Sequence, residues 1–141
     1  MNKRRKPITI LMADDNPDDR ALVQKALEKK FLASMYYVQN GEELMDYLGH
    51  RGKYTTLNSS PRPDIILLDL NMPGKDGREA IKEIKSDPNL RQIPIVVLTD
   101  SKMEEDIYHT YDWGGNSYIT KPLKFEALVE MMDSLGKYWA E

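Results

Sequence analysis

Short apolar runs separated by longer amphipathic stretches form the main pattern along this chain. Three of the runs are almost continuous in isoleucine, valine and leucine, which is typical of parallel strands covered on both faces. The clear runs are Ile8–Met12, Asp64–Leu70, Ile93–Thr99 and Ser117–Thr120, and a weaker, more alternating run covers Ser34–Gln39. We therefore expect five strands, with the weaker one nearer an edge of the sheet.

Helical periodicity fills the segments between these runs. Asn16-Pro17 has the form of a helix cap followed by proline at the first helical position. Three more caps, each with a glutamate three residues later, begin at Asn40, Asp76 and Ser101. The third helix is expected to end near Asp87-Pro88, and a last helix to begin near Phe125.

Strand and helix thus alternate about five times. Right-handed crossovers convert this order into an α/β fold, a doubly wound five-stranded parallel sheet with helices on both faces. We expect one domain over residues 1–141, with a core at about 7–136, a short basic N-terminal tail and no output domain. Gly49–Pro63 is one long polar loop, and its length predicts either a partner contact or plain slack.

Composition narrows the class of protein. The chain has 141 residues, a net charge of -3 and no cysteine. The negative charge disfavours nucleic-acid binding, and the missing cysteines exclude disulfides and thiol ligands. No apolar run approaches the roughly 20 residues that cross a bilayer. We expect a cytoplasmic protein with neither nucleic-acid nor membrane partners.

Polar side chains follow the predicted strands where each strand ends. They are Asp14, Asp15, Asp69, Thr99 and Lys121. Functional residues in such sheets lie at the carboxyl ends of the strands, so these five side chains should meet at one edge. Crowded carboxylates need a cation, and oxygen ligands favour a hard ion such as Mg²⁺. With ammonium and hydroxyl groups beside them, they would stabilise a transferring phosphoryl group, and Asp69 becomes the nucleophile that forms an aspartyl-phosphate.

These residues resemble the response-regulator receiver domain over nearly the whole chain. Asp14-Asp15 is similar to the acidic pair of that family, and Asp69 in "LLDLNMPGKDG" to its phosphoacceptor. Thr99 and Tyr118 resemble the switch pair. Lys121-Pro122 resembles the lysine-proline pair, whose peptide bond is usually cis in the family.

The resemblance implies a signalling phosphoacceptor rather than an enzyme. A phosphohistidine of a sensor histidine kinase would donate its phosphoryl group to Asp69. The Mg²⁺ ion would be held by Asp15, Asp69 and the carbonyl of Asn71, with help from Asp14. Thr99 and Lys121 would contact the phosphoryl oxygens. Movement of Thr99 and Tyr118 would then change the face formed by the fourth helix, fifth strand and fifth helix, which signals to a downstream protein.

The long Gly49–Pro63 loop and "YITKPL" resemble the stand-alone regulators of bacterial and cyanobacterial phytochrome kinases. Asn71 and Ser101 occupy positions that tune the lifetime of the acyl-phosphate in the family. Asp100 departs from the family, where a small residue is usual. It either repels incoming phosphate or points to solvent at the start of a helix.

Several alternatives remain open at this level. The chain could be a phosphorylation-independent pseudo-receiver that acts as a docking module. An aspartate-nucleophile hydrolase is disfavoured, since Asn71 stands where a second acid is needed. His50 and His109 lack ligand spacing, so structural roles are favoured over metal sites. Aromatic residues around the fourth helix and the C-terminus predict a homodimer; they are Tyr108, Tyr111, Trp113, Tyr138 and Trp139.

Overall fold

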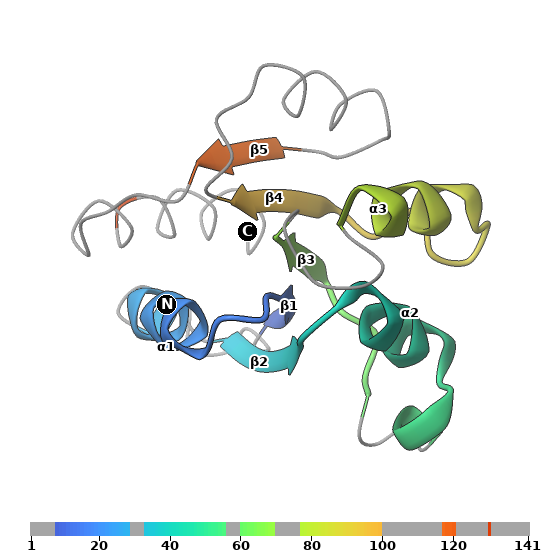
Figure 1. Ribbon diagram of the computed structural model, residues 1–141, viewed down its shortest axis with the longest axis horizontal. Coiled ribbons are helices and arrows are strands. Elements are labelled where there is room, and N and C mark those ends of the chain that lie inside the picture. Colours follow the sequence, from blue (N-terminus) through green and yellow to red (C-terminus); the bar gives the residue numbers. More distant parts are fainter. Residues whose placement is uncertain are drawn as a thin grey trace, which may run out of the picture.

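The computed structural model describes residues 8–28, 33–55, 60–69, 77–99, 117–120 and 130. Helices and strands alternate within these ranges (Figure 1). In chain order they are β1 (Ile8–Ala13), α1 (Pro17–Glu28), β2 (Ala33–Val38), α2 (Gly41–Gly49), the short 3₁₀ helix η2 (Gly52–Tyr54), β3 (Ile65–Leu68), α3 (Gly77–Ser86), β4 (Ile95–Thr99) and β5 (Ser117–Thr120).

The five strands form one parallel sheet in the order β2-β1-β3-β4-β5. This confirms the predicted five-stranded parallel architecture, and every expected strand is present. Differences are confined to strand ends. The fourth strand begins at Ile95 rather than Ile93, because Pro94 has no N–H to donate to the ladder. The carbonyl of Pro94 still accepts the N–H of Ile66 at 3.0 Å.

Both faces of the sheet are covered. Figure 1 shows α1 on one face and α2 with α3 on the other. Alternate residues of the central strands pack toward α2 and α3 and are fully or almost fully buried. They are Leu11, Ala13, Ile66, Leu68, Ile95 and Val97. Burial on both faces explains why these strands read as continuous apolar runs rather than as alternating ones.

Hydrogen bonds at the starts of α1 and α2 match the helix caps predicted from the sequence. The Asn16 side chain accepts the N–H groups of Asp18 and Asp19 at the start of α1. Asn40 caps α2 by accepting the N–H of Glu43 at 2.7 Å. In return, the Glu43 carboxylate accepts the N–H of Gln39, one residue before the cap, at 2.8 Å.

The segment that follows α2 is anchored to this helix where it is described. His50 ends the helix with a left-handed backbone (φ 55°), and η2 comes directly afterwards. The rings of Tyr47 and Tyr54 lie 5.2 Å apart, and the Tyr47 hydroxyl donates to the carbonyl of Pro61 at 2.9 Å. The buried hydroxyl of Ser60 lies 2.9 Å from Nδ1 of His50. The described part of the predicted Gly49–Pro63 loop is therefore packed against α2 and is not a loose connection.

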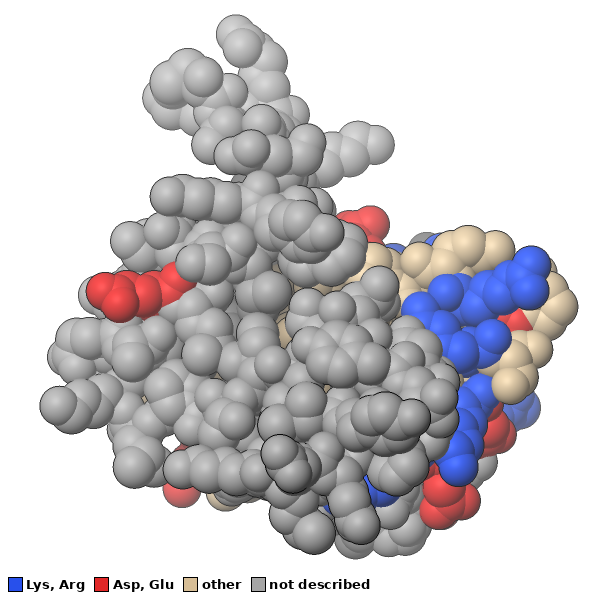
Figure 2. Space-filling model, turned by 90° about the horizontal axis from the view of Figure 1, so that it is seen from above, with Lys and Arg blue, Asp and Glu red and all other residues tan. Residues whose placement is uncertain are grey.

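Charged side chains of both signs cover the outer surface near α2 and α3. Figure 2 shows Lys and Arg gathered on this side of the molecule, with Asp and Glu among them. In α3, Arg78 and Lys82 share the helix with Glu79 and Glu83. Over the described ranges, no helix has both the length and the apolar character that spanning a membrane requires.

Candidate functional site

Three carboxylates meet at the carboxyl ends of the two central strands. Asp14 and Asp15 follow β1, and Asp69 follows β3. These strands are neighbours, but β2 precedes β3 in the chain and lies on the other side of β1, so the strand order reverses between β1 and β3. Ligands bind at this point in open α/β sheets. One carboxylate oxygen from each residue lies within 4.8 Å of the others.

Backbone hydrogen bonds fix the positions of two of these residues. The N–H of Asp69 donates to the carbonyl of Ala13 at 2.9 Å, and the N–H of Asp14 donates to the carbonyl of Val38 at 3.0 Å. Asp14 is fully buried and Asp69 is 8% exposed, whereas Asp15 is exposed. The cluster thus has a buried base and a solvent-facing carboxylate.

The turn between β1 and α1 makes a further contact with the cluster. The backbone N–H of Asn16 donates to Oδ1 of Asp14 at 2.9 Å. The sequence identified Asn16 only as a helix cap, so this bond was missed. An aspartate that bonds the N–H two residues later is a known turn pattern, and Asp14-Asp15-Asn16 carries that signal.

The arrangement has a clear chemical capacity. Three negative carboxylates within a few ångströms repel one another, and a divalent cation among them removes that repulsion. All three donors are oxygen atoms, which suits a hard cation. Asp14, Asp15 and Asp69 therefore fit a divalent metal site at the edge of the sheet.

The other predicted site residues are placed only in part. Thr99 is the last residue of β4 and pairs with Thr120 of β5, while Tyr118 pairs with Val97. The backbones of Thr99 and Tyr118 therefore lie on adjacent strands that run toward the same edge as the carboxylates. The remaining predicted residues lie outside the described ranges; they are Asn71, Asp100, Ser101, Lys121, Pro122 and the aromatic residues expected at a dimer interface.

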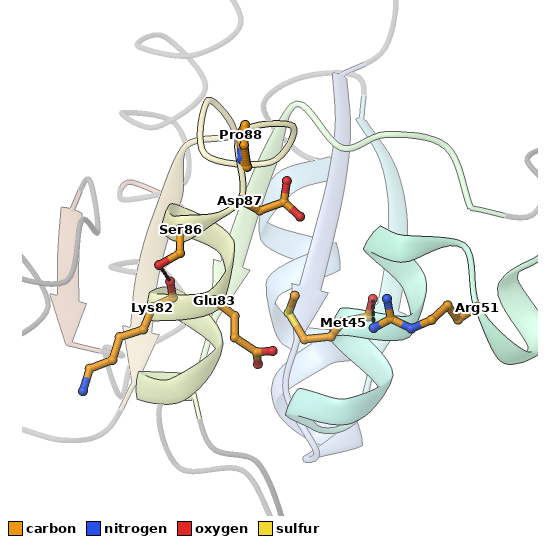
Figure 3. A pocket seen from close by; sticks show the side chains of 7 residues that line it. All are labelled: Met45, Arg51, Lys82, Glu83, Ser86, Asp87 and Pro88. Atoms are coloured by element: carbon orange, nitrogen blue, oxygen red, sulfur yellow. Dashed lines mark hydrogen bonds between the residues drawn. The ribbon is translucent and has the colours of Figure 1, made fainter.

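A hollow of about 560 Å³ lies elsewhere, between α2 and α3 (Figure 3). It is lined by Met45, Arg51, Lys82, Glu83, Ser86, Asp87 and Pro88. Two of its polar groups bond to the helices themselves, since Ser86 donates to the carbonyl of Lys82 at 2.7 Å and Arg51 to that of Met45 at 3.2 Å. The hollow continues past the C-terminal end of α3, and no member of the acidic cluster lines it. We therefore assign the functional site to the acidic cluster.

Comparisons with known proteins agree with this geometry. The family model for the response regulator receiver domain matches residues 10–133. The response regulator Rcp1 of Synechocystis sp. is 39% identical over 136 residues, which cover 96% of this chain and 90% of Rcp1.

Two solved structures are similar over almost their whole length. The phosphorylated cyanobacterial phytochrome response regulator RcpA has a TM-score of 0.87 at 42% identity, covering 95% of this chain and 94% of RcpA. The Mn²⁺-bound form of Rcp1 has a TM-score of 0.85 at 39% identity, covering 96% of each chain. With an acidic cluster between β1 and β3, a parallel five-stranded sheet and a family match over most of its length, the chain belongs to the response regulator receiver domains.

Proposed function

We propose that this chain is a single-domain response regulator that accepts a phosphoryl group on Asp69. One observation carries the proposal: Asp69 lies at the end of β3 with its carboxylate oxygen within 4.8 Å of those of Asp14 and Asp15. A carboxylate in this position is costly unless it is used, because neighbouring carboxylates repel it.

The proposed reaction is a transfer between two protein side chains. A carboxylate oxygen of Asp69 attacks the phosphorus of a phosphohistidine on a sensor histidine kinase. The new P–O bond forms as the P–N bond breaks, and the imidazole leaves with its electron pair. The product on this chain is an acyl-phosphate at Asp69. Thr99 and Lys121 are proposed to contact the phosphoryl oxygens, as in the family.

We propose Mg²⁺ as the cation of the site. Asp15 and Asp69 would hold it directly together with the carbonyl of Asn71, and Asp14 would assist. When bound, the ion would offset the negative charge of the carboxylates and of the incoming phosphoryl group. The buried base of the site, with Asp14 fully buried, supports this role by keeping the ligands in a fixed geometry.

The donor is proposed to be a phytochrome-type histidine kinase. Support comes from the resemblance to RcpA, whose structure is that of a phosphorylated cyanobacterial phytochrome response regulator. The signal would leave through the β4–β5 side of the sheet, where Thr99 and Tyr118 lie on adjacent strands, and would reach a partner protein.

The test is incubation with acetyl phosphate and Mg²⁺, followed by intact-mass measurement. The wild-type chain should gain one phosphoryl mass, and Asp69→Asn should gain none. Asp64→Asn is the matched control, because Asp64 lies just before the same strand at its opposite end, where its carboxylate accepts the N–H of Thr9 at 2.8 Å. This variant should be phosphorylated like the wild type.

Two results would contradict the proposal. One is a wild-type chain that gains no mass, which would favour the docking-module alternative. The other is a gain of mass by Asp69→Asn, which would place the phosphoryl group on another residue. The kinase assignment has its own test: transfer from a phytochrome kinase should be faster than transfer from a histidine kinase that serves another sensor.

A further inference from the structure

The acidic cluster and the first turn of α1 are connected through a single residue. Asn16 contacts both through different atoms. Its backbone N–H donates to Oδ1 of Asp14 at 2.9 Å, and its side-chain Oδ1 accepts the N–H of Asp18 at 2.9 Å and of Asp19 at 3.3 Å. Its carbonyl also accepts the N–H of Arg20 at 3.1 Å.

These bonds form a series that leads from the helix to the cluster. Two helix N–H groups donate to the Asn16 side chain and thereby fix the position of this residue. Its backbone N–H then donates to one oxygen of the Asp14 carboxylate. Asp14 is fully buried and Asn16 is exposed, so this partly buried hydrogen bond joins the exposed turn to the buried base of the cluster. This hydrogen bond limits the rotation of the Asp14 carboxylate, which would assist at the cation site, and groups that orient the carboxylates around a metal in this way tune its affinity.

We propose that Asn16 is a positioning residue for the divalent cation: its side-chain cap on α1 holds the backbone amide that orients Asp14. The inference rests on the proposed cation site and extends it to a residue that does not contact the ion. Loss of the Asn16 side chain should therefore weaken cation binding, although the three carboxylates are unchanged.

A second helix cap in the same chain provides the control. Asn40 caps α2 in the same way, by accepting the N–H of Glu43 at 2.7 Å, and its carbonyl accepts the N–H of Leu44. Asn40→Ala therefore removes a helix cap of the same chemistry. The hydrogen bonds of Asn40 named here are made with residues of α2 and not with the carboxylate of Asp14. An effect that follows only from lost helix stability should be equal in the two variants.

The experiment measures Mn²⁺ affinity by electron paramagnetic resonance and stability by urea unfolding. Asn16→Ala should bind Mn²⁺ about tenfold more weakly than the wild type, and Asn40→Ala should bind it with wild-type affinity. Asn16→Ser retains a capping oxygen and should restore most of the affinity. Asn16→Gly removes the oxygen with a smaller loss of helix stability, so it should weaken binding even if Asn16→Ala folds poorly.

The outcomes separate this inference from the proposed function. A wild-type chain that binds no Mn²⁺ would overturn both. If the wild type binds Mn²⁺ and Asn16→Gly binds it with the same affinity, only the positioning role is overturned. Equal weakening in Asn16→Ala and Asn40→Ala would also overturn it, because the effect would then be one of general stability.

Discussion

The backbone N–H of Asp69 donates to the carbonyl oxygen of Ala13 at 2.9 Å, which joins the phosphoacceptor candidate to the residue before the acidic pair. Asp69 and Asp14 consequently cannot move apart without the loss of a hydrogen bond at the centre of the sheet. The three carboxylates are therefore held close together in the folded chain, and we expect a bound cation to relieve the repulsion among them.

This expected repulsion predicts that Asp69→Asn is more stable than the wild type when no cation is bound. In the presence of a chelator, removal of one carboxylate should raise the free energy of unfolding by about 1 to 4 kcal/mol, the range for charges a few ångströms apart in water or near a protein surface. Urea unfolding with EDTA measures the change. In Mg²⁺ the wild type should gain stability and the variant should gain less.

The control is again Asp64→Asn. Asp64 is exposed, and its carboxylate accepts the N–H of Thr9, so its loss should lower stability slightly or leave it unchanged. A decrease in stability for Asp69→Asn in EDTA would show that the carboxylate is stabilised by neighbouring groups and not repelled.

The Glu43 carboxylate predicts a pH dependence. Partial burial alone would raise the pKa of Glu43, but hydrogen bonds from Tyr54, Lys53 and Gln39 together hold this pKa below its ordinary value of 4.5. The Tyr54 hydroxyl donates at 2.5 Å, and Nζ of Lys53 lies 2.9 Å away. Because the pKa is lower in the folded chain than in the unfolded chain, the group stabilises the fold above about pH 4.5, and this stabilisation is lost as pH falls through the folded pKa.

The measurement is the free energy of unfolding of the wild type and Glu43→Gln between about pH 6 and pH 3. The advantage of the wild type should be greatest at the upper end and should shrink toward the lower end. Glu42→Gln makes the same chemical change at the exposed neighbouring glutamate. If Glu42→Gln shows the same pH-dependent difference, the effect is one of net charge and the role assigned to Glu43 is wrong.

Two glycines three positions apart in the chain, Gly49 and Gly52, should respond in opposite ways to substitution by alanine. Gly52 has a φ of 59°, in the left-handed region, although a Cβ there would meet only Asp46 at an ordinary 3.6 Å. Gly52→Ala should therefore cost about 1 to 2 kcal/mol, from the backbone alone. Hydrogen exchange at η2 and urea unfolding both measure this loss.

Gly49→Ala is the matched substitution. A Cβ at Gly49 would meet the guanidinium of Arg51, which is the end of a flexible side chain that can move away at little cost. Alanine also favours the helix over glycine by up to about 1 kcal/mol. Stability should therefore stay constant or rise. A loss as large as that of Gly52→Ala would mean that the Arg51 side chain is held rigidly.

Much of the fold could be predicted because its signals are local. Continuous apolar runs identify the buried parallel strands, and Asn16 and Asn40 identify two helix starts, because both features depend on neighbours in the sequence. The proximity of Asp14 to Asp69 also followed from the sequence, since parallel strands place their carboxyl ends at one edge.

The packing of the segment after α2 could not be predicted in the same way. Its bonds join residues whose contact depends on tertiary structure, such as the Tyr54 hydroxyl with the Glu43 carboxylate and the Tyr47 hydroxyl with the Pro61 carbonyl. Length and polarity alone do not distinguish such an anchored segment from an open loop. The bond from Asn16 to Asp14 was missed for a different reason, because the helix cap already gave Asn16 a sufficient role.

The placement of β1 beside β3 has a consequence for how the site is acquired. A fragment that ends after α2 contains Asp14 and Asp15 without Asp69, and a fragment that begins at β3 contains only Asp69. Neither piece can display the complete set of ligands. During refolding, cation affinity should therefore develop only when the third strand has inserted next to the first, which makes metal uptake a reporter of the moment at which the centre of the sheet closes.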